Sequence, residues 1–314
     1  MESRFVTQDS ELLMLGVILY LPSECGVSGQ TYLPVVSGGT PAIHYEMPWH
    51  AGIYSKRFRP YMQICGGSLV SHTVVISAAH CFWSDQEKQL PAEDYAVALG
   101  KIYRPWNDPQ DKLVQKSDIP PRFFGSTANF QDDLALVVLR SAVVFSKAVR
   151  PVCLSFDYAF DVRQLTSGAL GKVAGWGLTS KDGPEAPTLQ VAQLPYIVIE
   201  ECVADASPDF LASITGDKIC AGYTNGTAVC KGDSGGGLVF LALPAAGSVR
   251  FYLRGVVSTA PPSINHSCNV YQWATFTHLI KHQHFIQSLL KGFCKFCTGG
   301  IYSEGNFIPP YLTK

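Results

Sequence analysis

Short apolar runs separated by glycine, proline, asparagine and aspartate recur along the chain from about residue 36 to residue 271. Runs of this length with turn residues between them predict β-strands, and their regular recurrence favours an all-β barrel or sandwich. The predicted strands are His50–Tyr54, Ser68–Ser77, Tyr95–Leu99, Leu134–Leu139, Gly171–Gly175, Val191–Ile199, Gly237–Leu243 and Phe251–Ser258.

The pattern changes after the last predicted strand. Residues 274–291 place apolar side chains on one face at helical spacing, and Gly292 follows them. This arrangement predicts a C-terminal α-helix that stops at the glycine. Residues 293–314 contain Cys294 and Cys297 and are predicted to form an irregular tail.

The N-terminal residues 1–35 do not follow the strand pattern. Their apolar run, Leu12–Leu21, has the length of a signal peptide but is too short to span a bilayer. Asp9 and Glu11 stand where a signal peptide carries positive charge. This pre-segment can therefore be a poor signal peptide, a signal anchor, or the stub of upstream modules, and we favour the stub.

Composition narrows the functional classes. The chain has 314 residues, 47% of them hydrophobic, and a formal net charge of −1, which favours a globular protein and argues against nucleic-acid binding. The ten cysteines lack metal-ligand spacing and indicate disulfides, hence a secreted, extracellular protein. Asn225 and Asn265 begin glycosylation sequons. We expect no metal and no cofactor, because the histidines show no ligand spacing and no loop is rich in acids.

One serine lies in a setting suited to nucleophilic chemistry. Ser234 follows Asp233 and is surrounded by four glycines, the first of which is Gly232. Glycines allow successive N–H groups to point into one concavity, which can hold the oxyanion of a tetrahedral intermediate beside the serine hydroxyl. A glycine-rich turn without chemistry is an equally good interpretation of this stretch alone.

A histidine and an aspartate supply the other groups that such a nucleophile needs. His80 follows the apolar run Val74–Ile76 and has small neighbours, so its ring can enter a cleft, although a lone histidine is more often structural. Asp133 begins a strand that is apolar at every later position, so its carboxylate is drawn inward and needs a partner. An imidazole N–H, a lysine or a backbone N–H can be that partner.

The order His80, Asp133, Ser234 is that of the chymotrypsin type of catalytic triad. The blocks Ala-Ala-His-Cys, Asp-Leu-Ala-Leu and Gly-Asp-Ser-Gly-Gly closely resemble the three signature blocks of the chymotrypsin-like serine endopeptidases. Further matching blocks are Pro48-Trp49, Cys65-Gly66-Gly67-Ser68-Leu69, Gly175-Trp176-Gly177 and Val256-Val257-Ser258. The resemblance covers residues 36–292, which we therefore expect to form the catalytic domain.

The resemblance implies two six-stranded antiparallel β-barrels with a C-terminal α-helix. His80 would act as general base, Asp133 would orient it, and Ser234 would attack the peptide bond, with the N–H groups of Gly232 and Ser234 as the oxyanion hole. Asp132 is less suited than Asp133 to this role, because Asp133 directly precedes Leu-Ala-Leu.

The family pattern also implies four disulfides. Gly171 and Phe240 stand where a fifth family bridge would place its cysteines. Cys294 and Cys297 are additional and can pair with each other or outside the chain. The implied pairs are Cys65–Cys81, Cys202–Cys220, Cys230–Cys268 and Cys25–Cys153, the last tethering the pre-segment.

The resemblance further places the specificity pocket. Ala228 stands where trypsin-like members carry the acid that binds arginine or lysine, and Asp233 is the only acidic residue between Lys218 and Ser303. A buried cationic side chain would lack a counter-charge, so we expect a preference for apolar residues before the scissile bond. The other residues expected to line the substrate site are Val229, Ser258, Ala260 and Asn269, with Ala260 crowding the pocket mouth.

The sequence Val36-Ser37-Gly38-Gly39 resembles the family's activation terminus. Cleavage before Val36 would free an amino group that pairs with Asp233, so the uncut chain is expected to be a zymogen. Pro34-Val35 precedes this bond and is apolar, so the hypothesis is that the enzyme activates itself or is activated by a protease of like specificity.

The chain resembles the arthropod modular serine proteases of the clotting factor C type, which start proteolytic immune cascades. The resemblance rests on the apolar activation site, the apolar pocket, and the stretches Trp49-His50-Ala51-Gly52-Ile53-Tyr54 and Val97-Ala98-Leu99-Gly100-Lys101. Protein substrates, among them downstream zymogens, and macromolecular inhibitors are the partners implied; we expect a monomer with no membrane span. Two alternatives remain: a catalytically impaired homologue that acts as a binding or cofactor protein, and a digestive elastase- or chymotrypsin-like enzyme.

Overall fold

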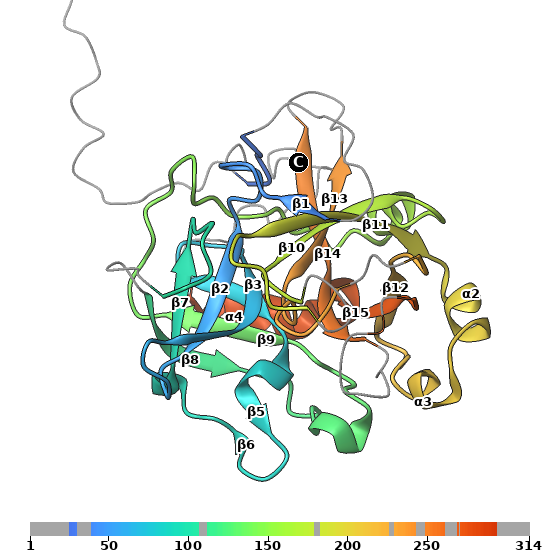
Figure 1. The fold of residues 1–314 in the computed structure, drawn as a ribbon, viewed down its shortest axis with the longest axis horizontal. Helices are drawn as coiled ribbons and strands as arrows, with labels where there is room; N and C mark the ends of the chain where they lie inside the picture. Colours follow the sequence, from blue (N-terminus) through green and yellow to red (C-terminus); the bar gives the residue numbers. More distant parts are fainter. Residues whose placement is uncertain are drawn as a thin grey trace, which may run out of the picture.

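A computed structural model describes residues 25–29, 39–106, 112–178, 183–225, 229–242, 249–260, 269 and 271–293. These residues form two antiparallel β-barrels that lie side by side (Figure 1). The first barrel closes in the order β2 (His50–Ser55), β3 (Met62–Leu69), β4 (Val74–Ser77), β9 (Ala135–Leu139), β8 (Lys112–Asp118) and β7 (Tyr95–Leu99).

The second barrel also has six strands and closes through the pairing of its first and last members, in the order β11 (Gln190–Ile197), β10 (Leu170–Gly175), β13 (Gly237–Ala242), β14 (Arg250–Thr259), β15 (Ala274–His278) and β12 (Lys218–Ala221). The short strand β1 (Thr40–Pro41) adds to the outer edge of β11. The two-barrel fold with a C-terminal helix that the sequence predicted is therefore confirmed.

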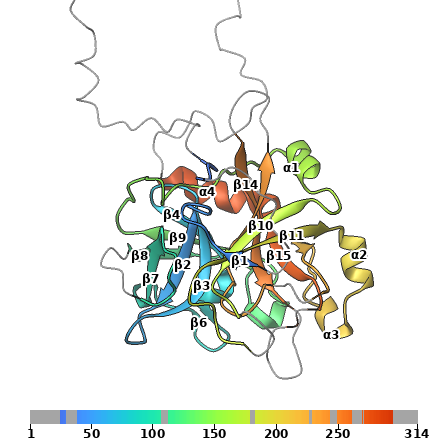
Figure 2. The same ribbon diagram turned by 45° about the horizontal axis from the view of Figure 1, so that its top comes forward.

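Short elements fill the connections between strands (Figure 2). A hairpin joins β5 (Trp83–Ser84) to β6 (Lys88–Gln89). The α-helices are α1 (Tyr158–Gln164), α2 (Ile199–Ala204), α3 (Pro208–Leu211) and α4 (Gln283–Phe293), and the 3₁₀ helices are η1 (Ala79–Phe82), η2 (Ala92–Asp94), η3 (Gly125–Ala128) and η4 (Leu279–His282).

The C-terminal helix begins later than the sequence predicted. Residues 274–278 form strand β15, which pairs with β12 on one side and β14 on the other, and the chain turns helical only at Leu279. The segment alternates Thr275, Phe276 and Thr277, residue types that favour a strand, and the periodicity of the following helix concealed this. Gly292 lies inside α4 and does not end it.

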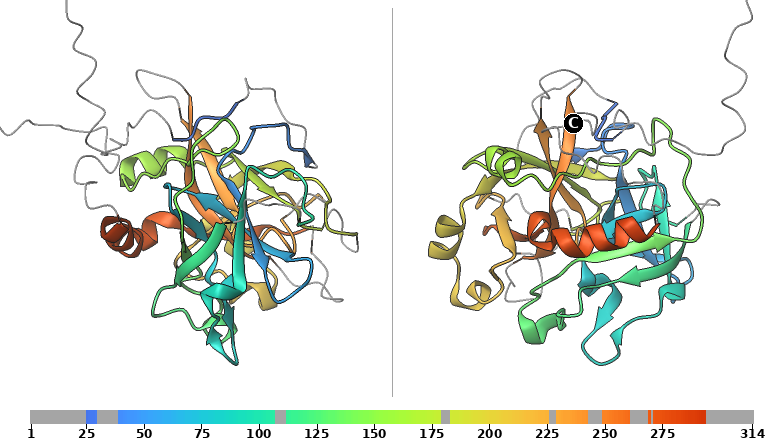
Figure 3. Two further views of the ribbon diagram at one scale, coloured as in Figure 1. Left: turned by 90° about the vertical axis from the view of Figure 1, so that its left-hand side faces the viewer. Right: turned by 180° about the vertical axis from the view of Figure 1, so that it is seen from behind.

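Helix α4 lies on the outside of the barrels (Figure 3). Its Ile286 is fully buried and belongs to the main apolar core, against which Phe285, Leu289 and Leu290 also pack. That core joins first-barrel residues such as Ile53 to second-barrel residues such as Val256, so the barrels share one packed interior.

The polar strand β8 was not predicted, because only its Val114 and Ser117 are buried and its sequence lacks an apolar run. The predicted segment Ser68–Ser77 turns out to contain the end of β3, a turn and the whole of β4.

Disulfides fix three long connections. The pairs Cys25–Cys153, Cys65–Cys81 and Cys202–Cys220 are formed as the family pattern implied. Cys230 is also disulfide-bonded, whereas Cys268, Cys294 and Cys297 lie outside the described residues. No helix in the described ranges is both long and apolar enough to cross a membrane.

Residues 25–29 are bound to the second barrel by more than their disulfide. The Gly26 N–H donates to the Pro151 carbonyl, and the Gly26 carbonyl accepts from the Phe251 N–H. Gly26 has φ +68°, and a Cβ there would lie 2.5 Å from the Phe251 carbonyl oxygen, so only glycine fits this contact. Residues 25–29 are thus docked against β14.

Candidate active site

A buried carboxylate and an imidazole meet where two strands of the first barrel end. Strand β4 runs directly into η1, which carries His80, while Asp133 precedes β9, the partner of β4. The His80 Nδ1 lies 2.8 Å from Asp133 Oδ2, and the His80 backbone N–H donates to Asp133 Oδ1 at 2.9 Å. Asp133 has no exposed surface. Two contacts therefore fix the orientation of the imidazole relative to the carboxylate.

The second barrel completes the surroundings of this carboxylate. The Ser258 hydroxyl donates to Asp133 Oδ2 at 2.6 Å, and the Thr277 hydroxyl donates to the Asp133 backbone carbonyl at 2.8 Å. The sequence had placed Ser258 with the substrate-binding residues and did not predict its contact with the acid. Asp133 is therefore held by both barrels.

The electrostatic coupling of the pair stabilises its charged forms. Burial opposes ionisation of both groups, but the charge of Asp133 and its hydrogen bond raise the pKa of His80. The charge and hydrogen bonds of His80, together with Ser258, lower the pKa of Asp133. An imidazolium formed at His80 thus has a carboxylate beside it that remains ionised.

Ser234 lies in the turn that leads into β13 and contacts the strands next to His80. Its backbone carbonyl accepts from the Gly66 N–H of β3 at 2.7 Å. Gly235, with φ +80°, packs so closely on β4 that a Cβ would lie 2.3 Å from the Ser77 hydroxyl. The turn therefore lies against the end of the strand that carries His80. No hydrogen bond joins His80 to Ser234 in the described residues, so their pairing remains a prediction.

The backbone beside Ser234 has unused donors. Neither the Gly232 N–H nor the Ser234 N–H donates a hydrogen bond to another described residue. Gly232 has φ +101°, and its carbonyl accepts from the buried Gln63 side-chain amide at 3.0 Å. This role of Gln63 could not be predicted, because a glutamine two residues before Cys65 carries no signal that distinguishes it from a surface residue. Gln63 thus anchors this turn to the first barrel.

Asp233 lies in the same turn and is half-buried. Its carboxylate accepts from the Gly177 N–H at 2.8 Å and the Cys230 N–H at 2.9 Å. A Cβ on Gly175 or Gly177 would collide with this carboxylate, at 1.9 Å and 2.3 Å respectively. Burial raises its pKa to about 6, although the two N–H groups oppose the rise. Among the described residues it forms no ion pair, and Val36 lies outside them.

The residues predicted to bind substrate are only partly described. Ala228 lies outside the described residues. Val229 is buried in the apolar core of the second barrel, while Ala260 and Asn269 are half-buried. The structure therefore places these residues around the second barrel but leaves the shape of the pocket as a prediction.

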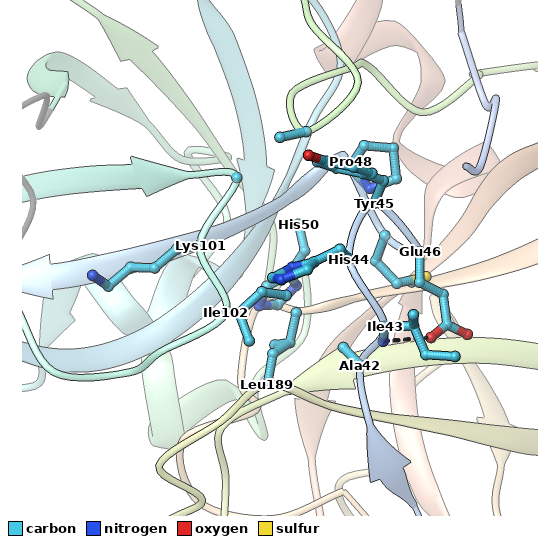
Figure 4. Close-up of a pocket in the computed structure, with 13 residues that line it drawn as sticks. Ala42, Ile43, His44, Tyr45, Glu46, Pro48, His50, Lys101, Ile102 and Leu189 are labelled. Carbon is cyan, nitrogen blue, oxygen red and sulfur yellow. Dashed lines mark hydrogen bonds between the residues drawn. The ribbon is translucent and has the colours of Figure 1, made fainter. Parts of the chain in front are cut away.

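A small cavity lies apart from these groups (Figure 4). It is lined by the segment Ala42–Pro48, by residues 100–102, by Ala148 and Leu189, and by His50 of β2. None of His80, Asp133 and Ser234 lines it. The cavity is therefore not part of the candidate active site.

Two antiparallel barrels, with a buried aspartate bonded to a half-buried histidine at the edge of one and a serine turn of the other packed against it, are the arrangement of the chymotrypsin-like serine endopeptidases. The chain belongs to the trypsin family, whose model, described as Trypsin, matches residues 36–280.

Curated relatives agree with this assignment. The chain is 32% identical over 250 residues to a modular serine protease of Drosophila melanogaster, covering 76% of this chain and 38% of that protein. It is 32% identical over 257 residues to Limulus clotting factor C of Carcinoscorpius rotundicauda, covering 79% and 25% respectively. It is 32% identical over 248 residues to the proclotting enzyme of Tachypleus tridentatus, covering 76% and 62%. The chain spans less than two thirds of the length of each of these relatives.

Proposed function

We propose that this serine endopeptidase cleaves peptide bonds through His80, Asp133 and Ser234, and that residues 36–292 form its catalytic unit. The observation that carries the proposal is the fully buried Asp133, which holds the His80 ring at 2.8 Å at the edge where the Ser234 turn packs. The surroundings of each of these three side chains suit one step of the reaction.

In the proposed mechanism His80 takes the proton of the Ser234 hydroxyl as that oxygen attacks the carbonyl carbon of the scissile bond. Asp133 keeps the Nδ1–H tautomer and stabilises the imidazolium, a role supported by its lowered pKa. The oxyanion is bound by the N–H groups of Gly232 and Ser234, which are free of other described partners. His80 then gives its proton to the leaving amine, and water releases the acyl group by the same steps in reverse.

The test compares hydrolysis of peptide substrates by the activated chain and its variants. Ser234→Ala and His80→Ala should each lower kcat by about 10⁴-fold or more, because the nucleophile and base act as a unit. Ser126→Ala changes an exposed serine whose hydroxyl contacts Asp85 and serves as the matched control. Equal activity of Ser234→Ala and the parent chain would contradict the mechanism.

We further propose that the enzyme prefers apolar residues before the scissile bond. The proposal rests on Ala228 and on the lack of any acidic residue other than Asp233 between Lys218 and Ser303. The Asp233 carboxylate accepts from Gly177 and Cys230 N–H groups and belongs to the turn itself. A peptide library digested by the activated enzyme should show cleavage after apolar residues; dominant cleavage after arginine or lysine would refute the preference.

Activation is proposed to require cleavage before Val36. The new amino group would pair with Asp233, and the raised pKa of about 6 supports this, because a carboxylate buried without a cation gains most from one. Pro34 and Val35 suit the same apolar preference, so the chain would activate itself or be activated by a protease of like specificity. A purified Ser234→Ala chain should stay uncut; if it is cut before Val36 as readily as the parent chain, self-activation is wrong.

The wider role is proposed to be that of a secreted, extracellular zymogen in a proteolytic cascade of the immune or clotting type. The names of the relatives, clotting factor C and proclotting enzyme, support this, and so do the disulfides. Its partners would then be zymogen substrates and macromolecular inhibitors. The activated enzyme should convert a purified zymogen whose activation bond follows an apolar residue; failure on such zymogens alongside rapid digestion of unfolded proteins would favour a digestive enzyme instead.

A further inference from the structure

A buried lysine lies between the two barrels, beneath the segment that leads to Asp133. Lys218 is the first residue of β12, and its side chain has no exposed surface. Its ammonium donates to the Phe130 carbonyl at 2.8 Å and to both carboxylate oxygens of Asp217 at 3.0 Å. All three partners are buried or part-buried oxygens, so burial of the charge is compensated by hydrogen bonds.

Asp217 binds the same segment through a second contact. Its Oδ2 accepts from the Asp132 backbone N–H at 3.0 Å and lies 3.1 Å from His282 Nε2 of η4. Its Oδ1 accepts from the Thr215 hydroxyl at 2.6 Å. Burial opposes ionisation of this carboxyl, but His282, Lys218 and Thr215 hold its pKa below the ordinary value. Asp217 is therefore an ionised group with every oxygen in use.

The segment held in this way has an unfavourable backbone. Asn129, Phe130 and Asp132 have φ of 52°, 57° and 59°, in the left-handed region that non-glycine residues seldom adopt. Such conformations persist only where the surroundings enforce them. Lys218 and Asp217 supply that enforcement, because one bonds the carbonyl of Phe130 and the other the N–H of Asp132.

The buried acids here also satisfy a geometric criterion for a metal site. Ligand atoms of Asp132, Asp217 and His282 all lie within 4.8 Å of one another. The Lys218 ammonium, however, already bonds both oxygens of Asp217 and supplies the positive charge that these acids need. The group is therefore better described as a lysine-centred cluster than as a cation site.

We propose that Lys218 and Asp217 are positioning residues for the catalytic pair: together they fix the turn at residues 129–132, which delivers Asp133 to His80 and places the Phe130 ring against the imidazole. The Phe130 ring meets the His80 ring edge-on with centroids 6.0 Å apart. This inference rests on the proposed roles of His80 and Asp133. It gives a positioning role to a buried lysine that lies outside the three signature blocks.

The cluster also acts on His80 through its charge. Lys218 lowers the pKa of His80, whereas Asp133 raises it. Among the described residues, the charged and titratable groups around Lys218 are Asp217 beside it, Asp132 of the turn with its ion-pair partner Arg122, and His282 of η4. Replacing the ammonium by an apolar group should leave the acids of this cluster uncompensated and make His80 more basic.

The test uses Lys218→Met, which keeps the length of the side chain but removes its charge. In the inactive Ser234→Ala chain, the pKa of His80 measured by NMR titration of the imidazole should rise. In the active chain, kcat/KM should fall about tenfold, because the turn loses an anchor. The acid limb of its pH profile should move to higher pH, because His80 then loses its proton at a higher pH. The double variant Lys218→Met/Asp217→Asn removes both charges and provides a second route if the single variant does not fold.

Lys172→Met is the matched control, because Lys172 of β10 is a half-buried lysine that also bonds a buried acid, Glu46, at 2.9 Å. Its replacement should lower thermal stability without moving the titration of His80. If Lys218→Met or the double variant folds and leaves both the His80 titration and kcat/KM unchanged, the positioning role is wrong. Should the parent chain lack activity dependent on Ser234, the proposed function fails, while the NMR titration still decides the role of Lys218.

Discussion

Acid should destabilise this protein through a histidine outside the candidate active site. His50 of β2 is 5% exposed, its ring packs on Trp176 with centroids 5.0 Å apart, and its Nε2 has no hydrogen-bond partner among the described residues. Burial lowers its pKa from 6.5 to about 4, so the folded protein holds His50 neutral where the unfolded chain would already bind a proton.

The difference between the folded and unfolded pKa of His50 sets the size and the sign of its effect on stability. At about 1.4 kcal/mol per pKa unit, the shift amounts to roughly 3 kcal/mol of unfolding free energy. Because the folded-state pKa is the lower one, this stability is fully present above pH 6.5 and is lost progressively as the pH falls to about 4.

The assay is urea unfolding, followed by tryptophan fluorescence, of chains that carry Ser234→Ala to prevent self-digestion. The parent and His50→Gln are compared at pH 7, 5.5 and 4, and the difference in their unfolding free energies is the quantity of interest. Asp233, whose pKa is raised to about 6, and His80, whose pKa is raised by Asp133, are common to both chains, so their contributions cancel.

Relative to His50→Gln, the parent should lose up to roughly 3 kcal/mol between pH 7 and pH 4. The control is His72→Gln, which replaces a partly exposed histidine whose ring stacks on Phe145. This substitution should not remove the pH dependence of the unfolding free energy. A difference between parent and His50→Gln that stays constant over the whole interval would refute the reasoning.

Two further substitutions test other contacts. Ser258→Ala removes the 2.6 Å hydrogen bond to Asp133 and should lower kcat/KM by about tenfold, roughly the 1.5 kcal/mol of a buried bond to a charged acceptor; an unchanged value in peptide hydrolysis would show that this bond is dispensable. Gly26→Ala forces a Cβ to within 2.5 Å of the Phe251 carbonyl and should lower the melting temperature by several degrees, whereas Gly168→Ala, which meets open space at a similar φ, should cost less; equal shifts would contradict the steric argument.

Much of the candidate site could be predicted from the sequence because its groups lie at strand ends with distinctive neighbours. Asp133 was expected to be drawn inward by the apolar strand after it, and it is fully buried beside His80. The strand pattern alone predicted a barrel or a sandwich, and the two barrels followed only from the resemblance of three short blocks to a known family.

The contacts that support these groups could not be predicted, because they join residues distant in sequence through side chains of common type. Ser258 reaches Asp133 across 125 residues, and Lys218 reaches Phe130 across 88. A lysine at the start of a strand usually faces water, and nothing in the local pattern distinguishes Lys218 from such a lysine. The predicted start of the C-terminal helix was wrong for a different reason. Residues 274–278 are buried between two partner strands, and periodicity alone cannot distinguish such a strand from a helix.

The role of Ser234 as the nucleophile is tested most directly by identifying the residue that a fluorophosphonate probe modifies. The chain is first cleaved before Val36 and then treated with the probe, and the adduct is located by peptide mass spectrometry. We expect one adduct, on Ser234, that is absent from the uncut chain and from the His80→Ala variant. An adduct on another serine, or labelling of Ser234 that does not depend on His80, would contradict it.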